Sequence, residues 1–215
     1  MDHAEFTTLL GRADERSMAA VVVGCVQRAL PTFDVLGDID LSGGGFADRL
    51  WRLVAGNEPV AAMHDVLTLS DEIRRYSAGP QGGVDPDVEG RQALLALAAE
   101  SIMRGERWLQ SGDLRDWADR SSSAILDMCQ YMDELTLEGV DEALETFPAG
   151  QFPQLTALER RELELQVATL TLSATSSSQD VQEIERRSQA RAAELRQTLL
   201  RLVEAGAIEQ NSWVN

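Results

Sequence analysis

The chain has 215 residues, of which 36 are acidic and 19 basic, so its formal net charge is −17 at pH 7. All of the basic residues are arginines, which excludes mechanisms that need a lysine, such as a Schiff base or a P-loop phosphate contact. The acidic excess also disfavours nucleic-acid backbones and anionic membrane surfaces, because both are negatively charged. We expect no nucleic acid and no membrane among the partners, whereas a basic protein partner is compatible with this charge.

The composition is typical of a folded protein. Apolar residues make up 44% of the chain, close to the usual share of about 45–50%. No apolar run approaches the roughly 20 residues that cross a bilayer. Asp14 and Glu15 precede the apolar segment 19–26 and argue against a signal peptide. We expect a cytoplasmic protein in which residues 1–215 form a single domain.

Helical periodicity dominates the first half of the chain, and strand patterns are almost missing. Four helices are expected there, at residues 4–12, 17–36, 46–56 and 58–76. Pro31 either kinks the second of these or starts a new helical segment. Gly and Pro at high density predict a flexible interhelical loop at 78–86.

Four more helices are expected in the second half, at residues 88–109, 113–137, 155–175 and 180–205. The first of these is apolar on more than one face, so it is a candidate for the central helix of the bundle. Ser111 or Asp113 is the expected N-cap of the second. A break is favoured between the last two helices, with Asp180 as the first residue of a capping box. The sequence therefore predicts an all-α bundle of seven or eight helices.

Residues suited to nucleophilic catalysis are scarce. The chain has two histidines, His3 and His64, and no Gly-x-Ser-x-Gly motif. Cys25 and Cys129 lie in apolar, helix-like surroundings, where free cysteines usually behave as small buried hydrophobes. We expect no disulfide and no catalytic residue.

Metal-ligand patterns are incomplete. Residues 38–43 place oxygen-bearing side chains and a glycine as at the start of an EF-hand, but the twelfth position is Arg49 rather than a bidentate glutamate. Zinc-ligand spacings are missing, and neither histidine follows a glutamate by three positions, as it would in a di-iron bundle. We expect no metal and no other cofactor.

A stretch without any base lies between Ser121 and Leu158 and contains seven acids. Six of them form a candidate partner-binding face: Asp133, Glu134, Glu138, Asp141, Glu142 and Glu145. This stretch is either a solvated helix face or a negative surface for a basic partner. The favoured function is a non-catalytic interaction or regulatory module, and one form of it is an immunity-type inhibitor of a basic protein.

Two alternatives remain open. A small-ligand-binding protein or an enzyme would have an interhelical pocket, for which Arg28, His64 and Glu100 are candidates. A structural homodimer would use the last helix pair. The apolar stripe of that pair is interrupted by Ser188 and Arg191, so a long coiled coil is not expected.

The segment Cys-Val-Gln-Arg-Ala-Leu-Pro-Thr-Phe at 25–33 is followed by a Gly-containing loop and by Leu50-Trp51. Together with Leu-Val-Glu-Ala-Gly at 202–206, this segment resembles the YjaG-like family of uncharacterised bacterial proteins. The resemblance implies an all-α fold of about one domain and no known activity, so no catalytic residue is carried over. Arg28 and Pro31 are the matching positions. An arginine there could bind a carboxylate with two parallel hydrogen bonds, which we expect to lock the fold rather than to bind a ligand.

Overall fold

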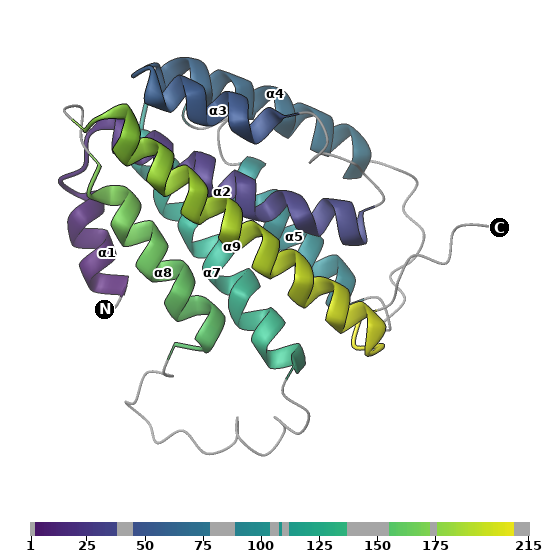
Figure 1. Cartoon of the computed structure of the whole chain (residues 1–215). Helices are drawn as coiled ribbons and strands as arrows, with labels where there is room; N and C mark the ends of the chain where they lie inside the picture. Colours follow the sequence, from purple (N-terminus) through teal and green to yellow (C-terminus); the bar gives the residue numbers. More distant parts are fainter. Residues whose placement is uncertain are drawn as a thin grey trace.

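The computed structural model describes residues 3–37, 45–77, 89–103, 108, 112–136, 155–172 and 176–208 (Figure 1). These residues form eight helices and no strand, which confirms the predicted all-α bundle. The helices are α1 (His3–Leu10), α2 (Glu15–Leu36), α3 (Phe46–Ala55), α4 (Pro59–Ser77), α5 (Glu89–Met103), α7 (Leu114–Thr136), α8 (Ala157–Leu170) and α9 (Ser178–Glu204). The predicted loop 78–86 and the tail that contains Trp213 and Val214 lie outside the described residues.

Helix α2 runs through the middle of the bundle. All of its residues are buried except Glu15, Asp34 and Val35. It contacts α3, α4, α5, α7, α8 and α9, and in Figure 1 α9 crosses it on one side while α3 and α4 lie along the upper edge. The expectation that residues 88–109 form the central helix was therefore wrong. Only one side of helix α5 is buried, since residues such as Gln92 remain exposed.

The sequence of α2 explains its position. Asp14 caps its first turn, because the carboxylate accepts hydrogen bonds from the backbone N–H of Ser17 at 2.8 Å and from the Ser17 hydroxyl at 2.7 Å. The helix continues through Pro31 rather than starting again there. In the described part of the chain, α2 is the one helix long and apolar enough to span a membrane, but 89% of its apolar window is buried by the other helices. A helix buried in the core of a folded protein has the same length and hydropathy, so this finding alone does not indicate a membrane span.

Side-chain caps define where the later helices begin. Asp113, one of the two predicted N-cap candidates, accepts from the N–H of Asp116 and caps α7. Thr156 and Glu159 form a capping box at α8. Helices α8 and α9 are separate, which confirms the predicted break. The capping box of α9 is shifted from the predicted register, because Ser177 is the N-cap and Asp180 is the third helical residue.

The apolar stripe of α9 packs inside its own chain. Val181, Leu195 and Leu199 are fully buried, and α2 is the main helix against which α9 lies. Ser188 and Arg191, which interrupt the stripe in the sequence, are buried as well. The face on which the homodimer hypothesis was based is thus already occupied.

Arginine side chains hydrogen-bond backbone carbonyls at the C-terminal ends of α2 and α3, which have no partner within their own helix, and one carbonyl just before α9. Arg16 donates to three carbonyls: Nε to Val54 at 3.0 Å, Nη1 to Ser176 at 2.8 Å and Nη2 to Ala55 at 3.2 Å. Arg91 donates in the same way to the carbonyl of Leu36, the last residue of α2, at 2.7 Å. The Arg16 guanidinium therefore fixes the end of α3 and the start of α9 to the first turn of α2.

Replacing Arg16 by lysine should destabilise the fold by about 1–3 kcal/mol. The single nitrogen of the lysine ammonium cannot reach all three carbonyls, which the planar guanidinium contacts through three different nitrogens. The free energy of unfolding from urea titration measures the effect. Arg120→Lys is the matched control, since Arg120 makes a partly exposed pair with Asp116 on α7 and should change stability by less than about 0.5 kcal/mol. Equal stability of the two variants would contradict this role of Arg16.

Candidate functional site

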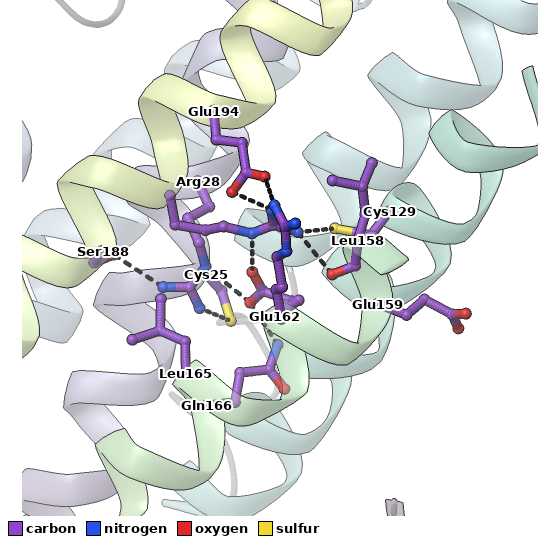
Figure 2. A network of polar contacts seen from close by, with 12 residues as sticks. Cys25, Arg28, Cys129, Leu158, Glu159, Glu162, Leu165, Gln166, Ser188 and Glu194 are labelled. Carbon is purple, nitrogen blue, oxygen red and sulfur yellow. Dashed lines mark hydrogen bonds and ion pairs between the residues drawn. The ribbon is translucent and has the colours of Figure 1, made fainter. Parts of the chain in front are cut away.

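A cluster of charged side chains is buried where α2, α8 and α9 meet (Figure 2). Glu162 of α8 has no exposed surface. Its Oε1 lies 2.8 Å from Nε of Arg28 on α2, and its Oε2 lies 3.6 Å from Nε of Arg191 on α9. One carboxylate thus faces two guanidinium groups, and Glu194, one-third exposed, supplies the second negative charge at 2.6 Å from Arg191.

Helix α2 makes room for Arg28 with a glycine. Gly24 lies one turn before Arg28, on the same face of the helix. A Cβ at Gly24 would come within 2.7 Å of Nη1 of Arg28. Glycine in the middle of a helix costs about 0.5–1 kcal/mol relative to alanine, and here it leaves space for the guanidinium. The other nitrogen, Nη2, lies 3.6 Å from Sγ of Cys25.

Helix α9 contributes the two residues that interrupt its apolar stripe. The Ser188 hydroxyl accepts a hydrogen bond from Nη1 of Arg28 at 2.9 Å. Arg191 donates from Nη2 to the carbonyl of Leu158 at 2.7 Å and approaches Sγ of Cys129 at 3.6 Å. Ser188 and Arg191 thus interrupt the apolar stripe because each of them contacts a polar group or a thiol on another helix.

The network extends to α7 through one glutamine. Gln166 lies one turn after Glu162 on α8 and donates from Nε2 to Oε1 of Glu162 at 2.8 Å. The Ser122 hydroxyl of α7 donates to Oε1 of Gln166. Figure 2 shows Gln166 and Glu162 pointing toward the same region between the helices. The contacts connect α2, α7, α8 and α9, and we call these residues the buried arginine–glutamate network.

The two thiols of the network are free and buried, as predicted. Burial raises the pKa of Cys25 from 9.0 to about 12, although the charge of Arg28 acts in the opposite direction. Burial, assisted by the charge of Glu162, also raises the pKa of Cys129. Neutral, inaccessible thiols are poor nucleophiles. The contacts of the network hold four helices together.

An open groove lies elsewhere, where the starts of α2 and α4 meet. It has a volume of about 780 Å³ and is lined by Asp14, Glu15, Arg16, Asn57, Glu58, Pro59, Val60, Ala61 and His64. A narrower pocket of about 370 Å³ shares Glu15, Pro59, Val60 and His64 with it and extends to Met63, Trp108, Gly112 and Leu114. We call the two together the α2–α4 groove.

The structure separates the three candidate pocket residues. Arg28 is buried in the arginine–glutamate network, as the expected role in locking the fold requires. His64 is exposed in the α2–α4 groove, with its ring in a T-shaped contact with Trp108 at a centroid distance of 5.4 Å. Glu100 is half-buried on α5. Neither Arg28 nor Glu100 lines the pockets that His64 lines.

The predicted acidic face is described only in part. Asp133 accepts a hydrogen bond from the N–H of Leu158 at 2.8 Å and so supports the first turn of α8. Glu134 accepts from Gln130 on its own helix. The other four acids lie outside the described residues: Glu138, Asp141, Glu142 and Glu145.

The incomplete EF-hand segment 38–43 also falls outside the part of the chain that the structure describes. Within that part, no group of three or more potential metal ligands occurs. Comparison of the chain with models of protein families, with curated protein sequences and with solved structures finds no match. The resemblance to the YjaG-like family therefore stays a prediction.

Sequence reasoning missed Glu162, Ser188 and Arg191 as members of one site. A signal was present, because Glu162 falls on the same helical face as the buried residues Leu158 and Leu165. A charge at such a position must be paired when the helix packs. The sequence does not show which distant side chain provides the partner.

Glu162→Gln should destabilise the protein by about 3–5 kcal/mol, because it leaves two buried guanidinium groups without their shared counter-charge. Urea titration measures the loss, and Glu164→Gln on the exposed face of α8 is the control. If Glu162→Gln does not fold, the triple variant Arg28→Met, Glu162→Leu and Arg191→Leu should fold, because it removes all three charges together. A Glu162→Gln variant as stable as its control would refute the role of the carboxylate.

The buried thiols should make stability depend on pH in the alkaline range. The pKa of Cys25 is raised in the folded state, so the unfolded state loses its thiol proton first as the pH rises. The contribution of this thiol to the free energy of unfolding is therefore complete below pH 9 and is lost as the pH rises from 9.0 toward about 12. The unfolding free energy of the wild type should therefore fall more steeply above pH 9 than that of Cys25→Ala/Cys129→Ala. If the free energies of unfolding of the two proteins fall in parallel above pH 9, the thiols are not the source of the pH dependence.

Proposed function

We propose that the chain is a non-catalytic binding module that receives a basic, partly apolar segment of a partner protein in the α2–α4 groove. The observation that carries this proposal is the lining of the groove, which combines exposed carboxylates with exposed apolar surface. An interface of this kind joins electrostatic complementarity at its rim to an apolar anchor at its centre.

The charges of the groove favour a cationic partner. Three acids line it, Asp14, Glu15 and Glu58, whereas Arg16 is the one arginine and His64 the one histidine of the lining. Glu15 and Glu58 are exposed and form no salt bridge with any described residue. The guanidinium of Arg16 donates to the carbonyls of Val54, Ala55 and Ser176, so it is held within the fold. The two free carboxylates are therefore accessible to lysine or arginine side chains of a partner.

The apolar part of the groove offers an anchor point. Val60 is 52% exposed and is the one large hydrophobic side chain exposed in the described part of the chain. It lies beside His64, whose ring contacts the half-buried Trp108. Aromatic and aliphatic groups in a shallow pocket typically receive one or two apolar side chains of a peptide segment.

The net charge of −17 supports the same class of partner. A strongly acidic protein attracts a basic one over distance and accelerates their association. An immunity-type inhibitor of a cationic protein is one function of this kind. The groove is a better candidate interface than the acidic stretch 133–145, because Asp133 is engaged in capping α8.

The test is the affinity of a partner isolated from the native cells for purified variants. Glu15→Gln/Glu58→Gln should bind at least tenfold more weakly, which is about 1.4 kcal/mol, and the loss should shrink as salt is added. Glu164→Gln/Glu204→Gln changes the net charge equally at exposed sites outside the groove and should bind within about twofold of the wild type. Val60→Asp should weaken binding at all salt concentrations.

Equal losses in both glutamine pairs would show that only the total charge matters and would overturn the groove as the interface. The charge-reversed variant Glu138→Arg/Asp141→Arg/Glu142→Arg/Glu145→Arg gives the second comparison. If this variant alone loses the partner, the interface lies in the acidic stretch and the groove proposal fails.

A further inference from the structure

A hollow rich in arginine lies between α8 and α9. It has a volume of about 260 Å³ and is lined by Arg161, Leu165, Arg186, Arg187, Ala190, Arg191 and Glu194. Four guanidinium groups face one carboxylate there, in a chain whose net charge is −17. Such a local excess of arginine is opposite in sign to the rest of the molecule.

Glu194 shows which chemistry the hollow accepts. Its carboxylate forms salt bridges with Arg161 and, at 2.6 Å, with Nη1 of Arg191, so it bridges α8 and α9. Arg191 is 5% exposed and is held from behind by the carbonyl of Leu158. An oxyanion is thus already bound between two guanidinium groups, one of which is fixed.

The two remaining arginines extend this arrangement toward solvent. Arg186 is held by Glu183 at 2.7 Å, and Glu183 does not line the hollow. The side chain of Arg187 forms no hydrogen bond or salt bridge with the described residues, although its charge, after the hydrogen bond from Arg186, helps to lower the pKa of Glu183. Its guanidinium donors are therefore available to a ligand. Glu194 pairs with Arg161 and Arg191, and Glu183 accepts from Nε and Nη2 of Arg186. Arg187 is then the one lining arginine without a salt bridge to a described carboxylate, and the other guanidinium groups keep unused N–H donors, because each has five.

We propose that this hollow binds the phosphoryl group of a phosphate monoester, with Arg161, Arg186 and Arg187 as donors. A phosphoryl group carries nearly two negative charges at neutral pH and three acceptor oxygens, which matches several arginine forks better than a carboxylate does. Leu165 and Ala190 provide apolar surface for the organic part of the ligand. Glu194 competes with the ligand for Arg161 and so limits its affinity.

The acidic remainder of the protein does not prevent binding. At physiological ionic strength, charges separated by more than about 8 Å are largely screened in water. The arginines that line the hollow therefore dominate the local potential. The site shares no lining residue with the α2–α4 groove, so the two proposals can fail independently.

The experiment is an NMR titration of the full chain with inorganic phosphate and with O-phosphoserine, followed at the backbone amides of α8 and α9. The expected result is a saturable shift at millimolar ligand that is confined to residues around the hollow. Arg186→Gln/Arg187→Gln should bind at least tenfold more weakly. The control Arg49→Gln/Arg120→Gln removes one exposed and one partly exposed arginine from other helices and should bind within twofold of the wild type.

Glu194→Gln provides a readout that loss of folding cannot imitate, because it should bind phosphate several-fold more tightly. Weaker binding by Glu194→Gln would overturn the proposal, as would an unchanged affinity of Arg186→Gln/Arg187→Gln or the absence of any saturable shift. A phosphoserine peptide and a sugar phosphate form the last comparison. Tighter binding of either one supports the phosphoryl site and identifies whether its source is a modified protein or a small molecule.

Discussion

The bundle depends on one buried carboxylate. Glu162 lies between Arg28 and Arg191 with no exposed surface, and the three residues come from three different helices. Taking such charges out of water costs several kcal/mol for each ion, and only good mutual geometry offsets this cost. The charges are therefore stable in the core only when α2, α8 and α9 are docked together. This requirement makes the packing of these helices cooperative.

The network also fixes how the helices are placed along each other. Arg28 needs the empty space above Gly24 and the hydroxyl of Ser188. If α9 slipped by one turn, Ile184 or Ala192 would replace Ser188 opposite Arg28, and the guanidinium would lose its hydrogen bond. An apolar stripe alone tolerates such slips far better, because one aliphatic side chain can replace another. The interruptions of the α9 stripe are thus what give it a unique register.

Most of the fold could be predicted because helical periodicity and caps are local. The eight helices and the break before α9 follow from residues within a few turns of one another. The central position of α2 was missed because residues 88–109 are apolar on more than one face and were favoured instead. The sequence also does not show that Arg28 and Gln27 are buried with partners on other helices. The network pairs residues as far apart as Arg28 and Ser188, which are separated by 160 positions. The α2–α4 groove likewise combines helix starts that are distant in the sequence.

The fold accounts for arginine at some positions of this lysine-free chain but not at all of them. Arg16 contacts three carbonyls through three nitrogens, and Arg191 contacts Glu162, Glu194 and the carbonyl of Leu158. A lysine has one nitrogen and could not make either set of contacts. Partly exposed pairs such as Arg120 with Asp116 need only a positive charge, which lysine would supply equally well. The requirement for arginine is therefore local to the buried sites. The contacts of the fold do not explain why lysine is missing at the exposed positions as well.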